Sequence, residues 1–303
     1  MRKIVVRVLG IVILIGLGIA VIPSLASRPA VAEAGQVQAP LLPKPDPFDF
    51  EAVRATGPKL NLRSALLVNY DNGKVLYAKN SEMTQPIASL SKLVAAMVVL
   101  DNTADLNQTM AISKDDAYRS SFTRLRQGWQ LSLYDLLHAS LMASDNRATR
   151  ALARAISGNY DDFVVKMNDK VKSLGLESTV FYDPTGLDSR NVSNAHEVAL
   201  ILHAAYKYPM IASITSKKTW SISIKNRRKL LLSLRNTNRL MYSSPYQVLA
   251  GKTGFIEASA YCLATLLEDD RGEKLTLVVL GAPGGSLRFK EAKKLATWGF
   301  AQN

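Results

Sequence analysis

The most informative stretch of the sequence is Pro86-Ile87-Ala88-Ser89-Leu90-Ser91-Lys92, followed by the apolar run Leu93-Val94-Ala95-Ala96-Met97-Val98-Val99-Leu100. It predicts a buried helix that begins near Ser89. Residues three apart share one face of a helix, so the Lys92 amine lies beside the Ser89 hydroxyl. A serine is a weak nucleophile until a base takes its proton, and a lysine is that base when burial or another cation lowers its pKa. Alone, the pair also fits an ordinary helix start with a solvated lysine.

Two further polar clusters lie downstream. They are Ser144-Asp145-Asn146 and Lys252-Thr253-Gly254. Each has a structural alternative, because serine and asparagine cap helices and the second triplet fits the start of a strand. Their order and spacing favour a joint chemical role. Ser144 follows Ser89 by 144 − 89 = 55 residues, and Lys252 follows Ser144 by 252 − 144 = 108 residues.

These three motifs in this order resemble the penicillin-binding protein and serine β-lactamase superfamily. The closest resemblance is to the D-alanyl-D-alanine peptidases, and among them to the D-alanyl-D-alanine endopeptidases of the penicillin-binding protein 7 type. It covers about residues 55–300 and is also carried by Asp183-Pro184-Thr185-Gly186-Leu187, Asn191-Val192-Ser193 and Asn236-Thr237-Asn238-Arg239-Leu240. The resemblance implies a β-lactamase/transpeptidase-like fold.

The hydrophobic pattern predicts an α and β architecture of the same kind. Strands are predicted over residues 64–70, 75–78, 220–224, 230–234, 259–267 and 275–280. Beyond the helix that starts at Ser89, helices are predicted over residues 131–156 with a break at 143–145, and over 161–174, 195–206 and 286–300. This order predicts an antiparallel β-sheet flanked by helices, with an inserted helical subdomain and with the first and last strands paired.

The resemblance implies a serine peptidase that forms an acyl-enzyme. Ser89 is then the nucleophile and Lys92 its base, and repulsion from Lys252 would lower the pKa of Lys92 if the two amines are close. Ser144 would relay a proton to the leaving amine. Asn146 would orient Lys92 or bind a substrate amide.

The same resemblance assigns substrate-binding roles to three residues. Thr253 would bind a substrate carboxylate, and Gly254 would leave room for the substrate against the strand edge. The backbone N–H groups of Ser89 and Phe255 would form the oxyanion hole. No Glu-x-x-Leu-Asn segment is present to speed deacylation, so β-lactam antibiotics are expected to acylate the protein stably as covalent inhibitors.

The net charge of the chain limits the classes of partner that we expect it to bind. The chain has 303 residues and a formal net charge of +13. A protein with this charge can bind acidic wall polymer, anionic lipid or nucleic acid. No nucleic-acid-binding module is recognisable in the sequence, so we do not expect nucleic acid as a partner. Eight basic residues and no acidic one lie between Lys217 and Arg239. They predict either a solvated surface or a groove wall that attracts anionic peptidoglycan stems.

The histidines and the single cysteine argue against a metal site and against a disulfide. His196 and Glu197 begin a zinc-protease pattern, but position 200 is leucine, so we expect no metal or other cofactor. The single cysteine, Cys262, excludes an intrachain disulfide and is expected in the core.

The N-terminus has the pattern of an export signal. Basic residues precede an apolar stretch and a small-residue cleavage site, which predicts a signal peptide over residues 1–26. An uncleaved membrane anchor is the alternative. A proline-rich linker is expected over 27–54 and the peptidase domain over 55–303. The periplasm is the expected location, with no transmembrane segment in the mature protein and no C-terminal anchor.

The sequence therefore predicts a DD-peptidase of peptidoglycan stem peptides. Endopeptidase action on D-alanyl–diaminopimelate cross-links is favoured over carboxypeptidase action on terminal D-alanine. The alternative from another class is a non-catalytic penicillin-binding sensor or scaffold of wall enzymes.

Overall fold

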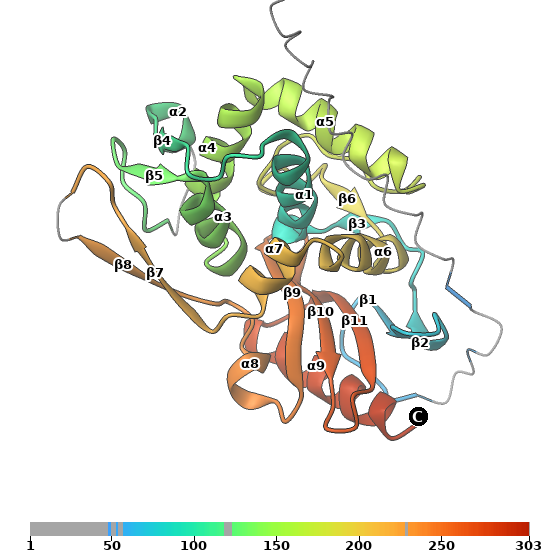
Figure 1. Cartoon of the computed structure of the whole chain (residues 1–303). Helices are drawn as coiled ribbons and strands as arrows, with labels where there is room; N and C mark the ends of the chain where they lie inside the picture. Colours follow the sequence, from blue (N-terminus) through green and yellow to red (C-terminus); the bar gives the residue numbers. More distant parts are fainter. Residues whose placement is uncertain (1–47, 50–52, 54–56, 118–122, 228–229, 303) are drawn as a thin grey trace, which may run out of the picture. The chain divides into compact units, whose positions relative to one another are not determined.

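The computed structural model describes residues 48–49, 53, 57–117, 123–227 and 230–302 (Figure 1). The predicted signal peptide and nearly all of the predicted linker lie outside these residues. Three described positions assigned to the linker, Phe48, Asp49 and Val53, pack on the domain. Phe48 is buried against His203, with ring centroids 5.1 Å apart, and the Asp49 carbonyl accepts a hydrogen bond from the Val75 N–H (2.9 Å).

A five-stranded antiparallel sheet organises the domain in the order β2-β1-β11-β10-β9. The strands are β1 (Ser64–Asn69), β2 (Val75–Lys79), β9 (Gln247–Ile256), β10 (Ala260–Glu268) and β11 (Lys274–Ala282). The first strand pairs with the last, with Ser64 opposite Leu280, as the sequence predicts. β9 is an edge strand, so in the described part of the chain one row of its backbone groups faces no other strand.

The two faces of the sheet are covered by different helices (Figure 1). Helix α9 (Gly285–Phe300) lies on one face and buries Leu295 and Ala296 against Leu67 and Leu277. On the other face, α6 (Ala195–Tyr206) contacts β1, β10 and β11. Strand residues alternate between the two faces, so both helices are held by one continuous apolar sheet.

The remaining elements form the helical insertion and three small sheets. The helices are the 3₁₀ turn η1 (Ala88–Ser91), α1 (Lys92–Asn102), α2 (Lys114–Ala117), α3 (Leu133–Met142), α4 (Asn146–Ser157), α5 (Tyr160–Ser173), α7 (Pro209–Thr215) and α8 (Leu240–Ser243). The small sheets pair β3 (Gln85–Pro86) with β6 (Val192–Ser193), β4 (Thr109–Ala111) with β5 (Gln130–Ser132), and β7 (Thr219–Ser223) with β8 (Leu231–Arg235). Together with the main sheet, they confirm the predicted fold class.

Three details add to the predictions. The break predicted at residues 143–145 separates α3 from α4. The predicted strands of the basic segment form β7 and β8, an antiparallel hairpin outside the main sheet. Within the described residues no single helix is long and apolar enough to cross a membrane; α6 and α7 together reach that length and apolarity, but with a bend of 107° between them.

Candidate active site

The start of α1 brings Ser89 and Lys92 together. Ser89 lies in η1, and Lys92 is the first residue of α1. The Lys92 Nζ donates a hydrogen bond to the Ser89 Oγ at 2.8 Å. Ala88, just before the serine, has a left-handed backbone (φ 50°), which is costly for a residue with a Cβ. The tight 3₁₀ turn therefore presents the serine at the helix start.

Lys92 is surrounded by acceptors but has no ion-pair partner in the described part of the chain. Its Nζ also donates to the Asn146 Oδ1 (2.7 Å) and to the Thr185 carbonyl. The side chain is fully buried, and this burial lowers the pKa of Lys92 to about 7, although the Asp183 carboxylate opposes the shift. A substantial fraction of the amine is thus neutral near pH 7 and able to accept a proton.

Ser144 lies in the short connection between α3 and α4. Its backbone is left-handed (φ 57°), a conformation that costs roughly 1–3 kcal/mol and persists only where the surroundings impose it. The next residue, Asp145, does so. Its carboxylate caps α4 by accepting from the Ala148 N–H (3.1 Å) and also accepts from the Thr123 hydroxyl (2.6 Å).

Lys252 comes to the same site from β9. Its Nζ donates to the Ser144 Oγ (2.8 Å) and to the Thr253 carbonyl (2.9 Å). Burial lowers the pKa of Lys252 well below its usual value, and the charges of Lys92 and Arg288 lower it further. The pKa of Lys92 is lowered chiefly by burial, and the repulsion between the two amines, which was expected from the sequence, disfavours the state in which both are charged.

The rest of the Lys-Thr-Gly segment lies against the nucleophile. A Cβ added at Gly254 would come within 2.9 Å of the Ile87 carbonyl oxygen and 3.2 Å of the Ser89 nitrogen, so only glycine allows this approach. The Thr253 hydroxyl donates to that of Thr237 (2.6 Å). Phe255 is half exposed at the free edge of β9.

A comparison with protein families agrees with this geometry. A sequence profile described as "D-alanyl-D-alanine carboxypeptidase" matches residues 51–284. The chain belongs to this family.

Two relatives within the family are named as endopeptidases. A D-alanyl-D-alanine endopeptidase of Escherichia coli (strain K12) is 36% identical over 251 residues, which cover 82% of this chain and 80% of that protein. A D-alanyl-D-alanine endopeptidase of Pseudomonas aeruginosa is 38% identical, with 78% and 76% covered. Among solved structures, the Streptomyces K15 DD-transpeptidase is 25% identical with a TM-score of 0.75, covering 81% of this chain and 99% of that one.

In this member of the D-alanyl-D-alanine carboxypeptidase family, the residues predicted for the site converge on one end of β9. Four of the five residues predicted to be catalytic take part in two lysine-to-serine hydrogen bonds, and the fifth, Asn146, accepts from Lys92. The structure places Thr253, Gly254 and Phe255 consecutively along β9 beside them.

The sequence did not reveal one important contact, the Thr185 carbonyl. It accepts hydrogen bonds from both Lys92 and Ser89, the latter at 3.3 Å. The Asp183 carboxylate shapes its loop by accepting from the N–H groups of Thr185 and Gly186, each at 3.0 Å. The residue pattern indicates a turn here, but a backbone carbonyl leaves no trace in sequence.

Arg288 was also missed. It lies in α9, is mostly buried, and donates to the carbonyls of Gly254 and Cys262, both at 2.9 Å. Arginine in the last helix belongs to none of the three motifs, so only the fold reveals that it reaches β9. Cys262 itself is buried and free, as predicted.

Proposed function

We propose that this protein is a serine DD-peptidase that cleaves D-alanyl–diaminopimelate cross-links of peptidoglycan through an acyl-enzyme on Ser89. One observation carries the proposal: a fully buried lysine whose pKa is lowered to about 7 donates a hydrogen bond to the hydroxyl of Ser89. Such a lysine is a base matched to neutral pH. The family and the names of the relatives supply the substrate class.

In the acylation step, the Ser89 Oγ attacks the carbonyl carbon of the D-alanine residue. Its proton passes to the neutral Nζ of Lys92 as the new C–O bond forms. The negative charge on the carbonyl oxygen is stabilised by the backbone N–H groups of Ser89 and Phe255, which typically contribute about 10²–10³ in rate. Their placement is supported by the close approach of β9 to Ser89.

The C–N bond then breaks and the leaving amine takes up a proton. In this proposal Ser144 relays it: its hydroxyl, which accepts a hydrogen bond from Lys252, gives its own proton to the amine and takes in exchange the proton that Lys92 received from Ser89. Lys92 is then neutral again and can act as the base in the next step. In deacylation, water attacks the ester carbon while Lys92 takes its proton. The ester C–O bond breaks, Ser89 regains its hydrogen, and the D-alanine carboxylate leaves. β-Lactams acylate the same serine.

Endopeptidase action is favoured over carboxypeptidase action by the printed names of the two relatives, whereas the family description names the carboxypeptidase. A non-catalytic sensor is disfavoured, because a protein that only binds penicillin has no need for a second buried lysine on Ser144. Action on peptidoglycan requires export, so we also propose a periplasmic location, which rests on the predicted signal peptide.

The test is to incubate the protein with purified cross-linked muropeptide dimers and with single stems ending in D-alanyl-D-alanine, and to identify the products by mass. Release of monomers from the dimers is expected, and Ser89→Ala should abolish it. Loss of one alanine from single stems without dimer cleavage would contradict endopeptidase action in favour of carboxypeptidase action. No product from either substrate would support the non-catalytic alternative.

A further inference from the structure

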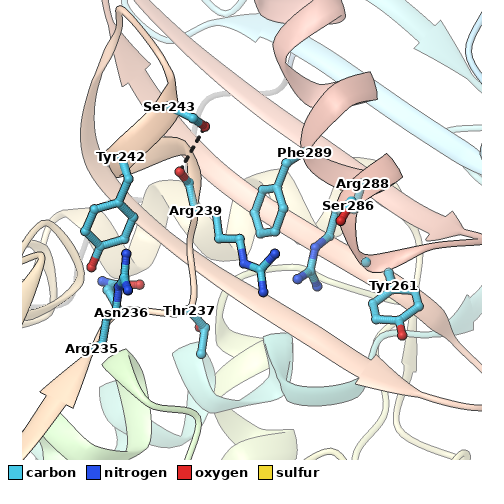
Figure 2. A pocket seen from close by; sticks show the side chains of 11 residues that line it. Arg235, Asn236, Thr237, Arg239, Tyr242, Ser243, Tyr261, Ser286, Arg288 and Phe289 are labelled. Atoms are coloured by element: carbon cyan, nitrogen blue, oxygen red, sulfur yellow. Dashed lines mark hydrogen bonds between the residues drawn. The ribbon is translucent and has the colours of Figure 1, made fainter.

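A large cavity lies next to the active site on the α9 side of β9. Its volume is about 990 Å³, at the upper end of the roughly 300–1,000 Å³ in which ligands of drug-like size bind. Figure 2 shows its lining side chains, which come from the end of β8, the segment before α8, strand β10 and the start of α9. None of the mechanistic roles above uses this space.

The cavity is strongly cationic. Arg235, Arg239 and Arg288 all line it, and none of the described residues in its wall is acidic. In the part of the chain that the structure describes, neither Arg235 nor Arg239 has an ion-pair partner. Three guanidinium groups around one hollow without a carboxylate repel one another, and an anionic ligand would relieve that repulsion.

Arg288 adds a buried positive charge to the wall of the cavity. The side chain is 8% exposed, and its Nε is buried without a hydrogen-bond partner. In Figure 2 its guanidinium and that of Arg239 point toward one another across the cavity. Burial lowers the pKa of Arg288 to about 10, and the nearby charge of Arg239 contributes in the same direction. Because its Nη1 donates to the carbonyls of Gly254 and Cys262, this positive charge is held in a fixed position in the cavity wall.

The wall of the cavity is hydrogen-bonded to the Lys-Thr-Gly segment of β9. Thr237, in its wall, accepts the hydrogen bond from Thr253, and Arg288 donates to the Gly254 carbonyl. A carboxylate on the first residue after the cleaved bond would lie near Thr253. Arg235 and Arg239 lie farther along the wall, at the end of β8 and at the N-terminus of α8, where a longer leaving strand would extend.

We propose that this cavity holds the leaving strand of a cross-link and that Arg235 and Arg239 bind a second carboxylate on it. The inference rests on the proposed function and adds the origin of its selectivity. A terminal D-alanine offers a single carboxylate and fills little of the space. The leaving side of a cross-link is a whole peptide stem, with further carboxylates and enough length to fill it.

The side chains suit this task. Arginine binds carboxylates with two parallel hydrogen bonds, which fixes their orientation. Arg235 is held in advance, because its guanidinium stacks on the Tyr242 ring at 4.4 Å and the Tyr242 hydroxyl donates to the Lys218 carbonyl (2.6 Å). Arg239 is exposed, so its replacement leaves the core intact.

The test uses the double variant Arg235→Gln/Arg239→Gln of the full chain. We expect kcat/KM for a cross-linked dimer to fall about ten- to a hundredfold, mainly through KM, as for the loss of one or two charge-assisted hydrogen bonds. Release of D-alanine from a single stem and acylation by penicillin should change less than about twofold. The matched control is Lys290→Gln/Lys294→Gln, which removes two exposed positive charges on α9 outside the cavity wall.

A dimer that is amidated on the leaving strand only at carboxylates beyond the residue next to the cleaved bond separates binding from structural damage. Amidation should lower kcat/KM of the wild type by the same factor by which the double substitution lowers kcat/KM on the normal dimer. Amidation should leave kcat/KM of the double variant unchanged. Equal losses on dimer and single stem, or no loss on either, would overturn the inference while leaving the proposed function intact. Failure of the wild type to react with penicillin or any peptide would instead overturn the proposed function itself.

Discussion

At the scale of single residues, the site depends on burying two lysines without carboxylate partners. Lys92 and Lys252 are both almost fully buried, and each donates to a serine hydroxyl instead of forming an ion pair within the described residues. Water would otherwise stabilise the charged amine, so burial lowers both pKa values. A Ser-x-x-Lys pair on the protein surface contains the same residues, but its lysine stays protonated and cannot act as a base.

This environment predicts a pH dependence of acylation. The rate constant for penicillin acylation, measured by stopped-flow fluorescence, should rise roughly tenfold per pH unit well below 7 and level off above it, because only the neutral Lys92 accepts the proton. Lys92→Arg should lose nearly all activity at every pH, since a guanidinium stays protonated. A flat wild-type profile between pH 5 and 9 would contradict Lys92 as the base.

At the scale of elements, the β7–β8 hairpin forms a two-stranded sheet of its own, apart from the main sheet. It carries most of the basic segment between Lys217 and Arg239, and Figure 1 shows it extending away from the main sheet. The end of β8 enters the cationic cavity through Arg235. Among the described residues between the two strands, 224–227 and 230, no hydrogen bond reaches a catalytic residue, so the charge of these residues acts on the site at a distance.

The hairpin prediction is tested with Arg227→Ser/Arg228→Ser. If the turn attracts anionic wall polymer, cleavage of intact peptidoglycan should fall about three- to tenfold at low salt, while cleavage of a short soluble peptide is unchanged. The loss should shrink at 0.5 M salt because charge is screened. A pair of replacements on α5, Lys166→Ser/Lys172→Ser, is the charge-matched control. Equal losses on both substrates would favour an ordinary solvated surface.

At the scale of the whole molecule, the sequence predicted the architecture well. The apolar runs of β1 and β11 and the change of period after residue 219 were enough to indicate an antiparallel sheet interrupted by helices. The break before α4 was visible because Asp145 and Asn146 are strong capping residues. α7 was missed, because its seven residues are too few to establish a helical period.

The site was predictable only where side chains act. Ser89, Ser144 and Lys252 were identifiable because residue type and order carry the chemistry. The Thr185 carbonyl was not, since any residue has one, and Arg288 was not, since its role depends on how α9 packs against β9. The pKa of Lys92 also belongs to the fold, because burial is a property of the packed molecule.

The central claim is that Ser89, activated by Lys92, forms a covalent bond to its substrate. The most direct measurement is to treat the protein with ampicillin and locate the added mass by peptide mass spectrometry. We predict a stable single adduct on Ser89 that Ser89→Ala removes and Ser91→Ala, a change two residues along the same turn, retains. An adduct on another residue, or none on a folded protein, would contradict it.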